Sequence, residues 1–191
     1  MIDFSVVTPV GPLPHHTRWL PECLASVRAQ TYPADEHLLV EDGANLPEQV
    51  GASVVRLLAP LGPTCVNAGI AVARNDWIVI LNSDDELLPR CLELLAARIA
   101  EIGLAEFYLR FPVVVGAGKT LPAGQCFHQA VWGSVGGYPE AIAFDVEFVS
   151  KILAAKRYPV YDIIRPEHAR EFYRYRDHAD TWTRQHAGQV G

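Results

Sequence analysis

Apolar runs and helix-periodic runs alternate along the first hundred residues. Short stretches rich in Val, Ile and Leu predict strands at 4–8, 37–41, 53–58 and 77–81. Between them, apolar residues recur at three- and four-residue spacing, which predicts helices from about Thr17 to Val27, over 64–73, and from about Pro89 to Ile102. The strand runs are continuously apolar, as is typical of strands covered on both faces. The alternation predicts an α/β fold with a single Rossmann-like, mostly parallel sheet flanked by helices.

The second half of the chain has a weaker pattern. Residues 107–115 predict one or two strands, 116–124 favour a loop, and apolar spacing predicts a helix that begins near Asp145. The polar and aromatic segment 166–191 is compatible with a docked strand and short helix or with partial mobility. We expect one domain over 1–165, divided near residue 105, followed by a separate segment, 166–191.

Composition places the chain among soluble globular proteins. Its 191 residues are half apolar, which is enough to bury a substantial core. No apolar run approaches the ~18 residues of a membrane-spanning helix, and the start Met1-Ile2-Asp3 lacks the basic residues of a signal peptide. Four scattered cysteines, without a paired spacing, argue against a zinc site and a disulfide framework: Cys23, Cys65, Cys91 and Cys126. We expect reduced thiols and a cytoplasmic location.

The charge is distributed unevenly. Residues 1–150 carry 8 Lys/Arg and 17 Asp/Glu, whereas residues 151–191 carry 8 and 5. The acidic body argues against nucleic-acid binding. The basic end suits a phosphate, an anionic lipid surface at the inner face of a membrane, or the acidic body itself; a simply solvated tail is an equal competitor.

Polar residues follow three of the predicted strands. Since ligands of open α/β sheets bind at the carboxyl ends of strands, three loops are candidates: Thr8-Pro9-Val10, Glu41-Asp42-Gly43, and residues 82–86, Asn-Ser-Asp-Asp-Glu. A single acid such as Asp42 after a strand is more often a helix cap or a turn residue.

The run Asp84-Asp85-Glu86 is more informative, because three adjacent carboxylates repel one another. A bound cation would offset that repulsion. One or two carboxylates, with phosphate oxygens and water, commonly hold Mg²⁺ or Mn²⁺ beside a diphosphate. The run therefore predicts a metal site, and removal of Asp85 is expected to relieve repulsion in the metal-free protein. A solvent-exposed acidic turn is the alternative.

Ordered motifs along nearly the whole chain resemble those of the family-two glycosyltransferases. On the donor side they are SVVTPV (5–10), LASVRAQTYP (24–33), LVEDG (39–43), NAGI (67–70) and ILNSDD (80–85). On the acceptor side they are HQAV (128–131), GGYPE (136–140) and FDVE (144–147), followed by YRDH (175–178) near the C-terminus.

The resemblance implies the A-type glycosyltransferase fold, with donor binding in the first half and acceptor binding in 106–165. It implies that the metal, Mn²⁺ or Mg²⁺, is held by Asp85 as the preferred direct ligand, with Asp84 and His178. It also implies contacts with a nucleotide sugar, commonly linked to uridine diphosphate, from Thr8, Pro9, Val10, Asp42, Asn67, Ser83, Asp84 and Arg176.

The resemblance assigns Asp145 as general base, and the chemistry supports such a role. A carboxylate that takes the acceptor proton, opposite a stabilised leaving diphosphate, inverts the anomeric centre. Glu147 is the rival base, although two residues along a helix it points to a different side. Asp145 as a mere helix N-cap is the alternative.

We therefore expect an inverting, hexosyltransferase-type enzyme that acts on a carbohydrate or lipid-linked acceptor in polysaccharide or cell-envelope glycan synthesis. A catalytically degenerate nucleotide-binding module is the alternative, because Asn82 stands where the family often has aspartate and residues 111–125 leave little room for an acceptor pocket. A sugar-phosphate nucleotidyltransferase is disfavoured, since the loop 10–16 is proline-rich and lacks lysine. Whether the protein forms a homodimer stays open.

Overall fold

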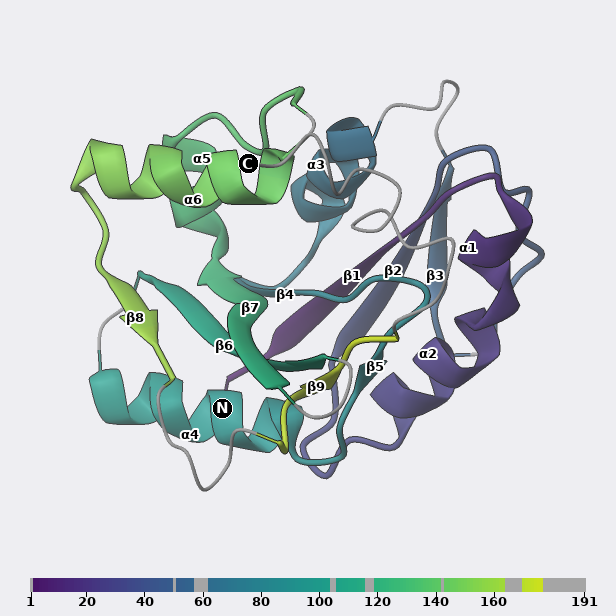
Figure 1. Cartoon of the computed structure of the whole chain (residues 1–191), viewed down its shortest axis with the longest axis horizontal. Helices are drawn as coiled ribbons and strands as arrows, with labels where there is room; N and C mark the ends of the chain where they lie inside the picture. Colours follow the sequence, from purple (N-terminus) through teal and green to yellow (C-terminus); the bar gives the residue numbers. More distant parts are fainter. Residues whose placement is uncertain are drawn as a thin grey trace.

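A single curved sheet runs through the molecule with helices on both of its faces (Figure 1). This computed structural model describes residues 2–49, 51–56, 62–103, 106–115, 119–141, 143–163 and 170–176. The strand order in the described chain is β3-β2-β1-β4-β7-β6-β9-β5, and β8 pairs with β6.

The first half contributes the parallel part of the sheet. Its strands are β1 (Phe4–Val10), β2 (Glu36–Glu41), β3 (Ser53–Arg56) and β4 (Trp77–Ile80), all parallel to their neighbours. The connecting helices are α1 (Pro14–Arg18), α2 (Leu20–Arg28) and α3 (Gly62–Val72). Helix α3 packs closely on the sheet at Gly69, where an added Cβ would lie 2.6 Å from side-chain carbons of Val7 and Val40.

The second half extends the sheet with mixed pairing. Strand β7 (Lys119–His128) lies antiparallel between β4 and β6 (Tyr108–Val115). Strands β8 (Val160–Asp162) and β9 (Tyr173–Arg174) run parallel to β6, and β5 (Glu86–Leu87) pairs antiparallel with β9. The remaining helices are α4 (Cys91–Ile102), α5 (Gln129–Ser134) and α6 (Phe144–Ala155). Five of the eight pairs are parallel, so the predicted α/β fold with a mostly parallel sheet is confirmed.

Alternate residues of the central strands enter two different cores. On β1, Val6 packs with α2 and α4 on one face, whereas Val7 packs with α3 and α6 on the other. On β4, Val79 and Ile78 divide in the same way. Because both faces are covered, apolar residues occur at consecutive positions of these strands, and the polar residues of β1, Ser5 and Thr8, are buried as well.

The ends of several elements differ from the sequence-based prediction. Strand β1 continues through Pro9 to Val10, although the proline was expected to stop it. Pro9 lacks a backbone N–H, but no hydrogen bond between β1 and β4 is lost. The pairing of these two strands ends at Val7, before Pro9. Thr17 lies inside α1, and the N-cap of α2 is Trp19. Part of the predicted loop 116–124 belongs to β7.

The short elements β5, α5 and β8 were not predicted, whereas β9 agrees with the docked strand considered for 166–191. The expected separate segment 166–191 is described only over 170–176, and this part is integrated in the sheet through β9. All four cysteines are free and buried. Within the described ranges, no helix has the length and apolarity needed to span a membrane.

Candidate functional site

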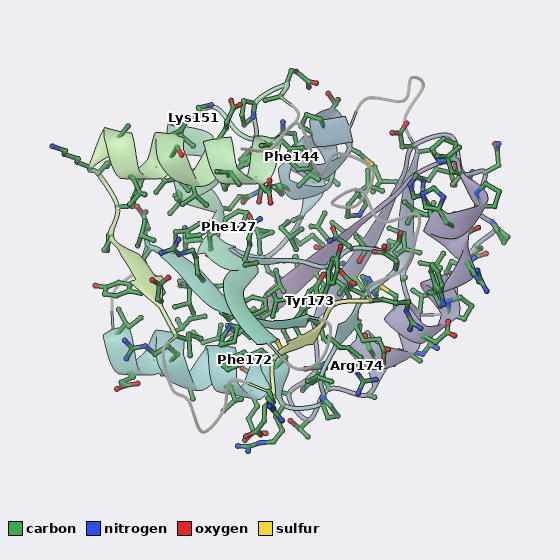
Figure 2. The ribbon with its side chains drawn as sticks, viewed as in Figure 1. Phe127, Phe144, Lys151, Phe172, Tyr173 and Arg174 are labelled. Carbon is green, nitrogen blue, oxygen red and sulfur yellow. The ribbon has the colours of Figure 1, made fainter. Side chains whose placement is uncertain are left out.

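The acidic loop, defined here as residues 82–86, connects β4 to β5 and lies against the C-terminal strand segment, defined as residues 170–176. Their backbones pair in antiparallel register, Glu86 opposite Arg174 and Leu87 opposite Tyr173. Figure 2 shows Tyr173 near the centre of the molecule, with Phe172 and Arg174 on either side of it in the chain. Residues 88 positions apart are thus brought together at one end of the sheet.

Asp85 is the buried centre of this contact, with only 1% of its surface exposed. Its Oδ1 accepts a hydrogen bond from the backbone amide of Arg176 at 2.8 Å. Its Oδ2 accepts from the hydroxyl of Tyr173 at 2.7 Å and from the side-chain amide of Asn82 at 3.3 Å. Burial, and next the charge of Asp84, raise the pKa of Asp85, and these hydrogen bonds oppose the rise.

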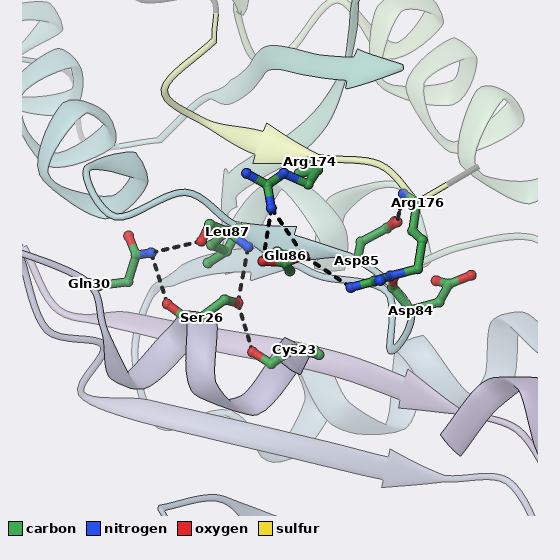
Figure 3. A network of polar contacts seen from close by, with 9 residues as sticks. All are labelled: Cys23, Ser26, Gln30, Asp84, Asp85, Glu86, Leu87, Arg174 and Arg176. Atoms are coloured by element: carbon green, nitrogen blue, oxygen red, sulfur yellow. Dashed lines mark hydrogen bonds and ion pairs between the residues drawn. The ribbon is translucent and has the colours of Figure 1, made fainter. Parts of the chain in front are cut away.

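Two arginines of the C-terminal strand segment offset the charge of the acidic loop (Figure 3). The guanidinium of Arg176 donates to the carbonyl oxygen of Asp84 and to Oε1 of Glu86, both at 3.0 Å. Arg174 lies 3.5 Å from the same carboxylate. Arg176 also stacks over the ring of Trp19 at 5.2 Å. The cationic charge expected from a bound metal is therefore supplied in part by the protein itself.

The predicted role of Asp85 as direct metal ligand does not fit this geometry. Both of its oxygens accept hydrogen bonds from protein donors, and removing it would leave those buried donors unsatisfied rather than relieve repulsion. Asp84 is only partly buried. The described residues contain no cluster of three metal-ligating side chains. The donor set fits a Mg²⁺ or Mn²⁺ ion held by Asp84 together with phosphate oxygens and water. His178 lies outside the described residues.

Side chains of the motif at 24–33 form hydrogen bonds with the backbone that follows the acidic loop. The hydroxyl of Ser26 accepts the backbone N–H of Leu87 at 3.1 Å, and the side-chain amide of Gln30 donates to the carbonyl of Leu88 at 2.8 Å. Figure 3 shows both side chains reaching from the α2 region to β5. These two motif residues therefore hold the strand that follows the acidic loop.

Asp42 lies where β2 ends, as predicted. Its backbone amide donates to the carbonyl of Val10 at 2.8 Å, which fixes the loop at the end of β1. Its Oδ1 is buried without a hydrogen-bond partner in the described structure. Burial raises the pKa of Asp42, and the nearby His16 opposes the rise.

His16 is a site residue that we did not predict from the sequence. Its ring covers Gly11, where an added Cβ would lie 2.2 Å from Nδ1, so only glycine accommodates the ring there. Burial, and then His15, lower the pKa of His16, whereas the charges of Asp84 and Asp42 raise it. His16 thus lies within electrostatic reach of both acids. Gly11, five residues before His16, was the sequence feature that could have pointed to this histidine.

The predicted contacts of Thr8 and Val10 with the nucleotide are not supported by their side chains. Thr8 is fully buried, and its hydroxyl lies 3.0 Å from Nε2 of the buried His37. Val10 packs in the small core around Leu39. Pro9 is half-buried, and Ser83 is buried next to Asp84. Thr8 and Val10 therefore support the strand end rather than face a ligand.

Asn67 also has a role different from the predicted one. Its Oδ1 accepts the indole N–H of Trp132 at 2.8 Å and the backbone N–H of Tyr138 at 2.9 Å. Its Nδ2 donates to the carbonyl of Tyr138 at 2.9 Å. Gly137 adopts φ +74°, and an added Cβ there would lie 2.7 Å from Oδ1 of Asn67. Asn67 therefore connects α3 to the GGYPE segment and is committed to protein partners.

Asp145 and Glu147 are exposed in the first turns of α6. The N-cap is Ala143, so the alternative that Asp145 serves only as the cap is wrong. Phe144 marks the end of α6 nearest to α3 (Figure 2). Burial, then Tyr108 and then the charge of Asp145 raise the pKa of Tyr138, so Asp145 acts electrostatically on the segment held by Asn67.

Comparisons with known proteins agree with this architecture. The sequence profile of glycosyl transferase family 2 matches residues 62–142. The O-antigen biosynthesis protein RfbC of Myxococcus xanthus is 35% identical over 117 residues, covering 54% of this chain and 9% of that protein.

Among solved structures, TarS of S. aureus (residues 1–349) in complex with UDP-GlcNAc matches with a TM-score of 0.74 and 18% identity, over 95% of this chain and 61% of that one. Its complex with UDP matches with a TM-score of 0.70 and 18% identity, over 93% and 61%. The chain thus spans about a tenth of its curated relative and less than two thirds of TarS. The profile match and the relative agree with the resemblance to glycosyltransferase family 2, and the solved structures show that the chain has the GT-A fold.

Proposed function

We propose that the protein transfers a sugar from a nucleotide diphosphate sugar to an acceptor hydroxyl, with uridine as the base. The observation that carries this proposal is the buried Oδ1 of Asp42 at the carboxyl end of β2, which has no hydrogen-bond partner among the residues that the structure describes. A buried carboxylate oxygen without a donor is costly. A ribose hydroxyl or a base N–H would satisfy it. The UDP and UDP-GlcNAc complexes of TarS, which has the same fold, support the choice of nucleotide.

The acidic loop is proposed to receive the diphosphate. Asp84 is the residue that would hold Mn²⁺ or Mg²⁺, and such an ion stabilises the negative charge of the leaving diphosphate. Arg176 contributes a fixed positive charge at the same loop, since its guanidinium is bonded to the Asp84 carbonyl and to Glu86. The charges of Asp42 and Asp84 both act to raise the pKa of His16, and this shared electrostatic effect supports the proposal that the two acids belong to one site.

Asp145 is proposed to take the proton of the acceptor hydroxyl. It lies in the first turn of α6, where the helix dipole favours the ionised carboxylate. Attack from the side opposite the leaving group inverts the anomeric centre. Glu147, in the same first turn, is the second candidate.

The acceptor is proposed to be a carbohydrate or lipid-linked intermediate of cell-envelope glycan synthesis, because the similar RfbC is named for O-antigen biosynthesis. A cytoplasmic location, with peripheral contact at the inner face of the membrane through the basic C-terminal end, remains part of this proposal. The transferred sugar is proposed to be a hexose, which would make the enzyme a hexosyltransferase.

A thermal-shift screen tests the donor proposal, because a ligand that binds the native state raises the melting temperature. UDP, UDP-GlcNAc, UDP-glucose, GDP and CMP are compared, each with Mn²⁺ and with EDTA. We expect the uridine diphosphates to give the largest shift, and Asp42→Ala to lose it. The control is Asp35→Ala, since Asp35 lies just before β2 and its carboxylate accepts an exposed hydrogen bond from the side chain of Asn75 at 3.1 Å. Equal shifts in Asp42→Ala and the parent would reject this site.

Slow hydrolysis of the bound donor with Mn²⁺ separates an enzyme from a degenerate binding module. UDP binding without any hydrolysis or transfer would favour the binding module.

A further inference from the structure

We propose that Asp85 is a positioning residue that fastens the C-terminal strand segment across the acidic loop and so sets the positions of Arg176 and Asp84. The inference deepens the proposed donor site and rests on it. It assigns to Asp85 a role distinct from metal coordination.

The hydrogen bonds of Asp85 join both ends of the acidic loop to the C-terminal strand segment. Oδ1 holds the backbone amide of Arg176, so it fixes the path of the chain and not only a side chain. Oδ2 holds the hydroxyl of Tyr173, and this hydroxyl in turn accepts the backbone N–H of Asn82 at 3.3 Å. One carboxylate and one hydroxyl therefore connect the start of the loop, its acidic centre and β9.

The backbone pairing at this position is short, which makes the side-chain anchor important. Strands β5 and β9 have two residues each, and one further backbone bond, from the amide of Leu88 to the carbonyl of Phe172 at 2.9 Å, extends their contact. Such short ladders contribute few hydrogen bonds. Asp85 adds its bonds beyond the end of the ladder, where the chain continues to Arg176.

The anchor determines where Arg176 lies relative to Asp84. The amide held by Asp85 belongs to the residue whose guanidinium contacts the Asp84 carbonyl, Glu86 and the ring of Trp19. If the hydrogen bonds of Asp85 are lost, the guanidinium of Arg176 is no longer held next to the backbone carbonyl of Asp84. The expected consequence is weaker binding of the donor diphosphate, irrespective of whether a metal is present.

Two variants separate positioning from coordination. Asp85→Asn has one acceptor oxygen in place of two and places an NH₂ group near that of Asn82. Tyr173→Phe removes the hydroxyl that bonds to Asp85 without changing any carboxylate. The matched control is Tyr32→Phe, because the hydroxyl of Tyr32 also makes two bonds, to the amide and carbonyl of Ile2, at the start of β1.

The first measurement is hydrogen exchange of the Arg176 amide in the full chain without nucleotide. We expect exchange to be at least about tenfold faster in Asp85→Asn and Tyr173→Phe, and unchanged in Tyr32→Phe. Unchanged exchange in both variants would overturn the anchor. This measurement needs no donor, so it decides the anchor even if the unmodified protein binds no UDP, a result that would reject the proposed function.

The second measurement is UDP affinity by calorimetry, with Mn²⁺ and with EDTA. We expect both variants to bind about five- to tenfold more weakly, by the same factor in the two conditions, and Tyr32→Phe to bind like the parent. Loss of the Mn²⁺-dependent part of binding in Asp85→Asn, with parental binding in Tyr173→Phe, would show that Asp85 is a metal ligand and overturn the proposal.

Discussion

Gln30 lies just after α2 and joins three elements through its side-chain amide. Its Nε2 donates to the carbonyl of Leu88 at 2.8 Å, with longer bonds to two other carbonyls, and its Oε1 accepts the backbone N–H of Leu92 at 3.0 Å. Leu92 is the second residue of α4, whose N-cap Arg90 provides no side-chain bond. Gln30 therefore caps α4 from outside that helix and holds β5 at the same time.

The substitution Gln30→Ala is expected to leave the Leu92 amide without a partner, whereas the Leu88 carbonyl keeps the bond from the backbone N–H of Cys91 at 2.9 Å. The unsatisfied amide costs roughly 1–3 kcal/mol and the lost bonds to carbonyls about 1 kcal/mol more, so the free energy of unfolding should fall by about 2–4 kcal/mol. At about 2–4 °C per kcal/mol for a domain of this size, the melting temperature should fall by roughly 5–15 °C. Gln30→Glu should be worse near neutral pH, because a buried carboxylate would face the carbonyl oxygens.

Thermal unfolding monitored by circular dichroism measures both variants against Gln49→Ala. The side chain of Gln49 makes a surface bond to the carbonyl of Pro47, so its loss should change the melting temperature by no more than about 2 °C. A Gln30→Ala variant that melts within the same range as Gln49→Ala would refute the assigned role. Partial recovery of Gln30→Glu at low pH would support it, since the protonated acid resembles the amide in charge.

Three further predictions concern the core, the pH dependence and the chemistry. Gly69→Ala should destabilise by about 1–3 kcal/mol in urea titration, because its Cβ meets two valines, whereas Gly133→Ala, with open space, should be near neutral; equal effects would contradict the packing. Burial, and then Arg28, lower the pKa of His37 to about 4, so the unfolded chain takes up the proton first and stability should be lost as the pH falls from about 6.5 to 4. The loss is up to about 3 kcal/mol, and His37→Gln should remove it; an unchanged profile would refute this. Asp145→Asn should keep UDP affinity while transfer falls ~10²–10⁴-fold, and Glu147→Gln should stay near parental; the reverse pattern would exchange their roles.

The sheet of the first half could be predicted from the sequence because its signal is local. A strand that is covered on both faces has apolar residues at consecutive positions, as Val6 and Val7 show by entering opposite cores. The two-residue strands β5 and β9 carry no periodicity of their own. Their pairing depends on Glu86 meeting Arg174, 88 positions later, and a local pattern contains no information on that contact.

The positions of Asp42 and Asp84 after strands were predicted correctly, whereas the roles of individual residues depend on distant partners. Asp42 lies at a strand end, and Asp84 lies in the loop after β4, as expected. Thr8, Asn67 and Asp85 are polar residues of family motifs that turn out to hold the structure together, each through a partner at least 29 positions away. A motif shows that a polar residue is needed at a position, but it does not distinguish a ligand contact from a bond that holds the loop.

The charge balance of the acidic loop bears on whether folding or nucleotide binding depends on a metal ion. In the structure Glu86 pairs with two arginines, and Asp85 is buried among hydrogen-bond donors, so part of the expected carboxylate repulsion is offset by the protein itself. We therefore expect the loop to fold without an added ion. A diphosphate brings new negative charge next to Asp84, and only then does a divalent ion have oxygen ligands from both sides. We therefore expect a divalent metal to strengthen nucleotide binding and to have little effect on folding. The comparison of Mn²⁺ with EDTA is accordingly informative only when UDP is present.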